Sequence, residues 1–276
     1  MRVRTDDGVM LEAVVEGSGP GLVLVHGFGG AKEDFSDHID PLARNHTVVT
    51  FDHRGHGASD KPTDPRAYDF ARLRADVLAV ADAAELSHFR LLGHSMGGMV
   101  ARGVAVAHPD RVEALVMMDT SPGPIPGFDP SLMEIAASVA LEQGKDELKA
   151  LLDMAKSLDT PAYVRVLAER PGYQEFNDRK WDALSAVMWG TLARAIAYQP
   201  DELESMRALT CRVLVIVGEQ DTPFLNVSRA MAATIPQASL VVVPNAGHSP
   251  QFENPEAWLD AMTRFLASVP VAPVAG

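Results

Sequence analysis

One serine of this sequence lies between glycines in a pattern that could make it a nucleophile. Residues 93–98 read Gly-His-Ser-Met-Gly-Gly, after the apolar run 89–92 and before the small-residue helical pattern 99–105. The order strand, glycine-framed serine, helix is the context in which G-x-S-x-G is a nucleophile elbow rather than a flexible loop. Such a tight turn strains the serine backbone, and the glycines remove Cβ atoms that would collide. We therefore expect the Ser95 hydroxyl to stand out at the sheet edge, beside the first amides of a helix.

Two further residues could activate this serine. A serine hydroxyl attacks only when a base takes its proton, and the base is a histidine oriented by a carboxylate. His248 follows the last predicted strand, and Asp221 follows the strand before it. The chain order Ser, Asp, His is the one expected when an elbow serine uses this kind of sheet. The positions favour Ser95, Asp221 and His248 as a catalytic triad.

Other assignments of the acid and the base stay open at this point. Asp221 could do no more than cap the helix that follows it. Asp119, directly after the strand that ends at Met118, is the rival acid, and Glu219 is a weaker one. His248 could be an ordinary loop histidine, although its place after the final strand favours catalysis.

The remaining histidines near these motifs are expected to be structural. We expect His94 to pack under the turn, and His26, His53 and His56 to hold loops by hydrogen bonds. His108, which precedes a proline, marks the end of the helix after the elbow. No spacing of His, Cys, Asp or Glu suggests a metal site, so neither a metal nor a cofactor is expected.

An attacked carbonyl becomes an oxyanion, and its charge needs hydrogen-bond donors already in place. The residue after the nucleophile, Met96, supplies one backbone N–H. The second is expected from Phe28, in the glycine-rich loop after the strand at 21–25. The alternative for that loop is a plain tight turn.

The elements that must position these residues alternate between strands and helices. Strands are predicted at 9–15 (a sheet edge), 21–25, 46–51, 89–92, 112–118, 212–217 and 239–243, and helices at 32–44, 68–86, 226–234 and 256–268. This alternation predicts an α/β fold with a mostly parallel sheet and helices on both faces. Ligands then gather at the carboxyl ends of the strands, where the glycine-rich stretches lie.

The alternation stops at the proline- and glycine-rich stretch 121–127 and resumes only near residue 210. We predict a core formed by residues 1–121 and 210–276 and an inserted helical cap at 122–209. A cap at the strand ends can act as a lid that forms the pocket and excludes water, although it could also be a stabilising decoration. Its apolar candidates for pocket lining are Phe128, Met133, Met154, Tyr163, Trp181, Met188, Trp189 and Leu192.

The composition of the cap and of the whole chain limits the ligand. We expect Phe28, Met188, Trp189 and Leu192 to bind the substrate, because a lid rich in methionine and tryptophan suits an acyl chain or a ring.

The net charge of −13 argues against nucleic acid, which requires clustered Lys and Arg. Cys211 is the only cysteine, and no signal peptide or membrane span is apparent, so a cytoplasmic protein is expected. The sequence does not define an oligomeric state.

Together these motifs resemble the α/β-hydrolase superfamily, in the group with serine esterases, enol-lactonases, acyl-homoserine lactonases, carbon–carbon bond hydrolases and cofactor-free haloperoxidases. The stretches that carry the resemblance are 26–29, 52–59, 93–98, Gly218 with Asp221, and Gly247 with His248. The resemblance implies the same roles for the triad and for the oxyanion donors Phe28 and Met96. Epoxide hydrolases and haloalkane dehalogenases look similar but carry aspartate in place of the elbow serine. Carbon–carbon bond hydrolases commonly have Gly-Pro-Gly near the oxyanion loop, where this chain has Phe-Gly-Gly.

The sequence therefore predicts a serine hydrolase that cleaves a carboxylic ester or lactone through an acyl-enzyme. An acyl-homoserine lactone and an enol-lactone are both plausible members of that substrate class. The alternatives are a perhydrolase or haloperoxidase that uses hydrogen peroxide, a carbon–carbon bond hydrolase, and a non-catalytic small-molecule receptor on the same fold.

Overall fold

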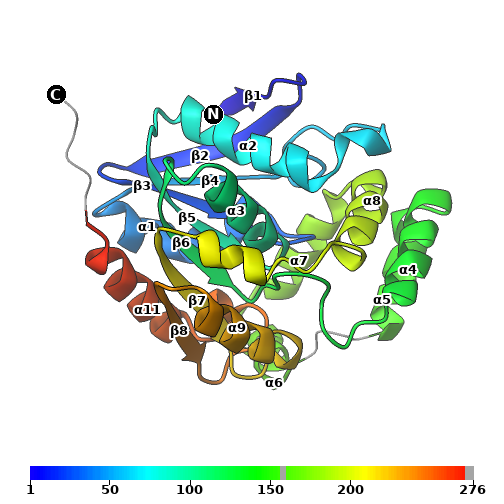
Figure 1. Ribbon diagram of the computed structural model, residues 1–276. Coiled ribbons are helices and arrows are strands. Elements are labelled where there is room, and N and C mark those ends of the chain that lie inside the picture. Colours follow the sequence, from blue (N-terminus) through cyan, green and yellow to red (C-terminus); the bar gives the residue numbers. More distant parts are fainter. Residues whose placement is uncertain (156–159, 271–276) are drawn as a thin grey trace.

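An eight-stranded sheet forms the centre of the computed structural model, which describes residues 1–155 and 160–270 (Figure 1). The strand order is β1-β2-β4-β3-β5-β6-β7-β8, and β2 alone runs antiparallel to its neighbours. The strands are β1 (Arg2–Arg4), β2 (Met10–Gly17), β3 (Gly21–Val25), β4 (Thr47–Phe51), β5 (Phe89–His94), β6 (Val112–Met118), β7 (Arg212–Gly218) and β8 (Ala238–Val243). The α/β class with a mostly parallel sheet is thus confirmed.

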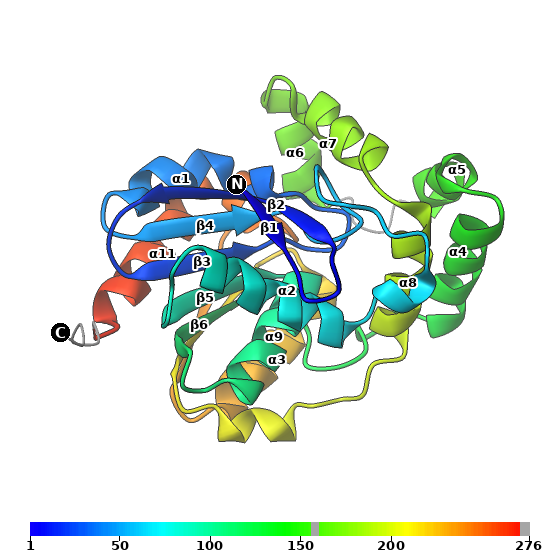
Figure 2. The same cartoon turned by 90° about the horizontal axis from the view of Figure 1, so that it is seen from above.

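Helices cover both faces of the sheet (Figure 2). In β3, Leu22 and Leu24 pack with α1 (Ser36–Ala43) and α11 (Pro255–Ser268) on one face. Val23 and Val25 belong to the core on the other face, with α2 (Phe70–Ala83), α3 (Met96–Ala107) and α9 (Thr222–Thr234). Successive side chains of a strand point to opposite faces, so an all-apolar strand serves two cores at once.

Two local predictions differ from the structure, and one short helix was not predicted. The strand predicted at a sheet edge is β2, and β1 lies outside it as the true edge. Of the three residues of β1, only Val3 is buried, and one apolar residue is too little to predict a strand from the sequence. The helix predicted at 32–44 is a 3₁₀ turn (Lys32–Phe35) followed by α1, and the short helix α10 (Pro250–Glu253) was not predicted.

Between β6 and β7, the described residues form five α-helices. They are α4 (Pro130–Glu142), α5 (Lys145–Ala155), α6 (Pro161–Glu169), α7 (Tyr173–Asp182) and α8 (Ala186–Ala197). Figure 2 shows them beyond one end of the sheet, and no strand lies among the described residues of this segment. The division into a core and a cap at 122–209 stays a prediction. In the described ranges, no helix is long and apolar enough to cross a bilayer.

The fully buried Arg54, three residues after the end of β4, joins the edge of the sheet to α2. Its Nη1 donates to Asp7 Oδ2 at 2.8 Å, and its Nη2 and Nε donate to the two carboxylate oxygens of Asp76 at 2.6 and 2.7 Å. The Asp7 hydrogen bond lowers the pKa of that carboxyl well below its usual value. The guanidinium therefore neutralises a carboxylate, Asp76, that has no contact with solvent.

We expect Arg54→Met to lower the free energy of unfolding by about 3–5 kcal/mol, because it leaves the buried Asp76 carboxylate unpaired. Urea unfolding and the thermal midpoint measure the loss. The matched control is Arg66→Met, since Arg66 also pairs with an aspartate but its side chain is 91% exposed. The control should unfold at the wild-type midpoint. An Arg54 variant as stable as the control would refute a structural role for this ion pair.

Candidate active site

Ser95 occupies the sharp turn between β5 and α3. Its φ of +55° and ψ of −119° lie in a region that non-glycine residues rarely adopt. Such a backbone costs about 1–3 kcal/mol and persists only when its surroundings enforce it. Here the Ser95 N–H donates to Met118 O at 2.8 Å, and the Thr120 hydroxyl donates to Ser95 O at 2.7 Å. Both partners lie at the end of β6, so the neighbouring strand fixes the turn.

The two framing glycines allow this turn to pack. A Cβ on Gly93 would lie 2.2 Å from the carbonyl oxygen of Gly97. A Cβ on Gly97 would lie 2.4 Å from the carbonyl oxygen of Val25, at the end of β3. Neither distance is possible for a real side chain, so strand and helix approach each other only because both positions are glycine.

The structure brings Ser95, His248 and Asp221 into one hydrogen-bonded chain. His248 Nε2 lies 3.0 Å from Ser95 Oγ, and His248 Nδ1 lies 2.8 Å from Asp221 Oδ2. A carboxylate only accepts, so Nδ1 carries the proton and Nε2 is free to accept from the serine hydroxyl. The Asp221 side chain is 2% exposed and that of His248 is 17% exposed. His248 is therefore placed to take a proton from Ser95, and part of its side chain remains in contact with solvent.

The structure separates Asp221 from its rivals. Asp221 stands at the N-cap of α9, but its side chain makes no capping hydrogen bond and points instead to His248. Glu219 accepts the backbone N–H of Asn245 at 3.0 Å and makes no hydrogen bond to the imidazole within the described part of the chain. Asp119 lies next to the pair, with its Oδ1 accepting the N–H of the last residue of β7. Of the three carboxylates, Asp221 holds the imidazole.

Two backbone amides lie beside the serine without an acceptor. A Cβ on Gly27 would lie 3.1 Å from the Cβ of Ser95, so the loop after β3 runs directly against the elbow. The next residue in that loop is Phe28, and Met96 is the first residue of α3. Within the described parts of the chain, neither N–H donates to a protein acceptor. These are the two donors expected for an oxyanion, and that role stays a prediction.

Neutral histidines support the loop that carries Phe28. His56 Nε2 accepts the N–H of Gly29 at 3.2 Å, and its Nδ1 donates to Arg54 O at 3.2 Å. Burial lowers the pKa of His56 to about 3, so the ring stays neutral and Nε2 can accept. His26 accepts the His53 N–H at 3.0 Å. The prediction that the His53 ring holds its loop by hydrogen bonds is wrong. The ring lies edge-on to His26, and neither of its nitrogens has a hydrogen-bond partner among the described residues.

Two more buried side chains hold the backbone around His248. His94 Nε2 donates to the carbonyl oxygen of His248 at 2.7 Å. Glu253, in α10, accepts the N–H groups of Gly247 and Ser249 at 2.5 and 3.2 Å with the same oxygen. The Glu253 carboxylate thus fixes the backbone immediately before and after His248. Nothing in the sequence pointed to Glu253, because its short helix has no periodic pattern.

We expect Glu253→Ala to lower kcat about 10- to 100-fold, because the loss of two charge-assisted hydrogen bonds frees the loop that aims the imidazole. KM should change little, since Glu253 does not face the serine. Steady-state kinetics measure both values. Glu256→Ala, at an exposed position three residues further on, is the control and should behave as wild type. Equal kcat in the two variants would contradict this role of Glu253.

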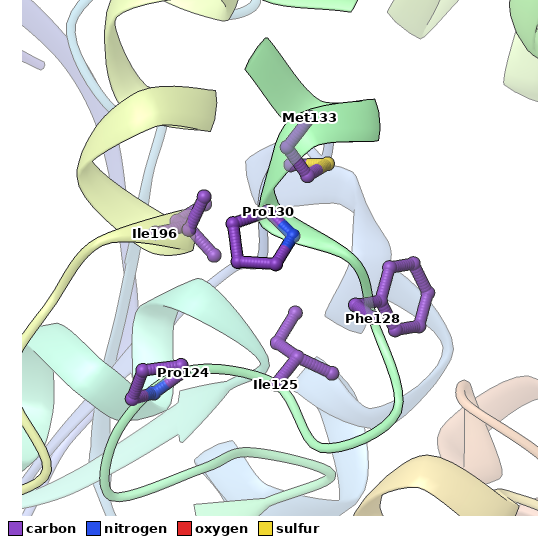
Figure 3. A pocket seen from close by; sticks show the side chains of 7 residues that line it. Pro124, Ile125, Phe128, Pro130, Met133 and Ile196 are labelled. Atoms are coloured by element: carbon purple, nitrogen blue, oxygen red, sulfur yellow. The ribbon is translucent and has the colours of Figure 1, made fainter.

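The predicted substrate-binding residues lie in different surroundings, and their role stays a prediction. The rings of Phe28 and Trp189 lie 5.1 Å apart, which links the loop after β3 to α8. Met188 and Leu192 are fully buried in the main core. Phe128 and Met133 line a small apolar cavity of about 20 Å³ near the end of α8 (Figure 3), which is room for roughly one water molecule. The side chain of Met154 lies outside the described residues.

The helix α6 docks on the loops that carry the acid and the base. The Ala162 N–H donates to Gln220 Oε1 at 2.8 Å, and Arg165 Nη2 donates to the carbonyl oxygens of Asn245 and Glu253. These residues neighbour Asp221 and His248 in the chain. Helix α6 is therefore tied directly to these loops.

Asp119, Asp221 and His248 also form a group with the geometry of a metal site, with one atom from each within 4.8 Å of the others. Internal hydrogen bonds explain the closeness: His248 Nδ1 donates to Asp221, and Asp119 accepts from Gly218. The proton on Nδ1 occupies the position that a metal would need. We therefore assign this group to the hydrogen-bonded site and not to a cation.

The fold and the elbow together define the class of protein. Residues 20–255 match the family described as having the alpha/beta hydrolase fold. The chain belongs to the α/β-hydrolase family.

Similar proteins within the family do not all carry out one reaction. A putative 2-succinyl-6-hydroxy-2,4-cyclohexadiene-1-carboxylate synthase of Bacillus subtilis is 26% identical over 98% of this chain and 99% of its own length. The crystal structure of the enol-lactonase from Burkholderia xenovorans matches with a TM-score of 0.85 at 23% identity, over 97% of this chain and all of that one; this is a likeness of fold. A thermophilic esterase from Thermogutta terrifontis matches with a TM-score of 0.81 at 26% identity, over 98% and 99% of the two chains.

Proposed function

We propose that this protein is a serine hydrolase that cleaves a carboxylic ester or a lactone through an acyl-enzyme. The observation that carries the proposal is the chain of contacts from Asp221 through His248 to the Ser95 hydroxyl, with distances of 2.8 and 3.0 Å. Its similarity to an esterase from Thermogutta terrifontis supports the ester-type substrate. The resemblance to enol-lactonases supports the lactone.

In this mechanism His248 Nε2 takes the hydroxyl proton while Ser95 Oγ attacks the substrate carbonyl. The tetrahedral oxyanion accepts hydrogen bonds from the N–H groups of Phe28 and Met96. The imidazolium, stabilised by Asp221, then protonates the leaving alkoxide, which departs as an alcohol. A water molecule gives its proton to His248 and attacks the acyl-enzyme, releasing the acid and restoring Ser95. In a lactone, the alcohol oxygen stays covalently attached to the acyl group throughout, so water releases a single product that carries both the acid and the former ring oxygen.

A panel of nitrophenyl esters of increasing chain length, assayed beside acyl-homoserine lactones and an enol-lactone, tests the proposal. Labelling of Ser95 by a fluorophosphonate is the companion measurement. We expect stoichiometric labelling and turnover of at least one class. Failure to label the folded protein would favour a small-molecule receptor, and peroxide-dependent bromination without ester hydrolysis would favour a haloperoxidase.

The proposed setting follows from the composition. We expect a small-molecule substrate and no nucleic acid partner, because the chain carries a net charge of −13 and no basic cluster. We expect no metal or cofactor, because no spacing of His, Cys, Asp or Glu in the sequence suggests a metal site. A cytoplasmic location is the expectation from its single cysteine.

A further inference from the structure

The triad has a second buried carboxyl group beside it. Asp119 follows β6 directly and is 0% exposed. One of its oxygens, one oxygen of Asp221 and a ring nitrogen of His248 all lie within 4.8 Å of one another. No step of the proposed mechanism involves Asp119.

The surroundings of Asp119 do not suit a negative charge. Its Oδ1 accepts the N–H of Gly218 at 2.8 Å, and its Oδ2 is buried with no donor among the described residues. The titratable groups that face it are Asp221 after β7, and His248 and Glu253 after β8. None of these is a permanent cation. Two adjacent buried carboxyl groups cannot both be ionised at low cost, so one of them holds a proton.

The hydrogen bonds decide which carboxyl group holds it. Asp221 accepts from His248 Nδ1–H and must be ionised to stabilise the imidazolium. In Asp119, Oδ1 already accepts a hydrogen bond from the Gly218 N–H, whereas Oδ2 has no hydrogen-bond partner among the described residues and can carry the proton. Burial, the charge of Asp221 and a hydrogen bond to Asp221 raise the pKa of Asp119 well above its usual value.

We propose that Asp119 is a positioning residue that stays protonated and donates its Oδ2–H to the Asp221 carboxylate. This inference rests on the proposed function, because it assigns a second hydrogen bond to the acid of the triad. The bond holds the Asp221 carboxylate toward His248 and spreads its charge, while Asp119 itself neither touches the substrate nor exchanges its proton during turnover.

The backbone of Asp119 supplies matched variants. Its φ is +47°, a region that asparagine and glycine tolerate better than other residues. Asp119→Asn keeps the shape and the neutral charge. The Gly218 N–H would fix the amide oxygen at Oδ1, so the NH₂ group would point to Asp221. Asp119→Gly keeps the backbone conformation but removes the donor.

We expect Asp119→Asn to retain kcat within about threefold of wild type, and Asp119→Gly to lose about 10- to 100-fold in kcat with little change in KM. The pH dependence of stability is the second readout. A raised pKa means that the folded state holds a proton that the unfolded state releases, so this stabilisation is present below the unfolded pKa of about 3.9 and is lost as pH rises through the folded pKa. The thermal midpoint of Asp119→Asn should therefore rise relative to wild type between pH 5 and pH 8.

Two results would overturn the inference. If Asp119→Asn loses as much kcat as Asp119→Gly, the site needs a negative charge at 119. If the midpoints of wild type and Asp119→Asn stay parallel across pH, Asp119 carries no extra proton. Ser95→Ala, assayed in parallel, separates this from the proposed function: absence of Ser95-dependent turnover in wild type would refute the function, whereas the stability readout on Asp119 needs no turnover.

Discussion

Ser95→Ala should lower kcat for ester or lactone hydrolysis by at least about 10⁴-fold, because no other group can form the acyl-enzyme. His248 lies 3.0 Å from the Ser95 oxygen and has no alternative nucleophile to activate within the hydrogen bonds of the site. Burst-phase release of nitrophenol should vanish together with steady-state turnover. The variant should keep its substrate affinity, since the hydroxyl reacts with the carbonyl and binds little else.

Folding and contamination need separate controls in this experiment. The elbow imposes a φ of +55° on alanine as it does on serine, so the thermal midpoint should stay close to the wild-type value. Ser228→Ala is the matched control, because its hydroxyl is buried without a partner among the described residues and lies in α9, away from the elbow. It should retain full activity. Turnover by purified Ser95→Ala that also resists fluorophosphonate would remove Ser95 from the mechanism.

Asp221→Asn should lower kcat by about 10⁴-fold, while leaving the shape of the site intact. An amide NH₂ facing His248 cannot accept from Nδ1–H, so the imidazole shifts its proton to Nε2. The nitrogen that faces Ser95 at 3.0 Å is then a donor and no longer a base. The imidazolium also loses the buried carboxylate that stabilises it. We expect a large loss in kcat and a small change in KM.

The control for Asp221 comes from the same loop. Glu219→Gln keeps an oxygen for the Asn245 N–H and should hold kcat within about threefold. Substantial activity in Asp221→Asn, abolished by adding Asp119→Asn, would make Asp119 the acid of the triad. That outcome would contradict both the assignment of Asp221 and the role inferred for Asp119.

Short-range sequence patterns predicted the elbow, the positions of the triad residues and the buried strands. The glycines around Ser95 and the polar residues after β7 and β8 were legible in the sequence, because the carboxyl ends of parallel strands share one edge of a sheet. Apolar runs such as residues 21–25 predicted strands that are buried on both faces. These signals are short-range or repeat with a fixed period, so the order of residues contains them.

Tertiary structure alone decided how the polar groups pair. Asp119 and Asp221 both follow strands at the same edge, and only the packing of their loops turns Asp221 to His248. The grip of Glu253 on the backbone at Gly247 and Ser249 depends on a four-residue helix that no pattern marks. The edge strand β1 is defined by its pairing with β2. The surroundings of the His53 ring, which has edge-on ring contacts with His26 and Phe51 and no hydrogen bond among the described residues, likewise depend on the tertiary structure. A side chain's hydrogen-bond partner depends on distance and direction in space, and sequence position constrains neither across a gap of a hundred residues.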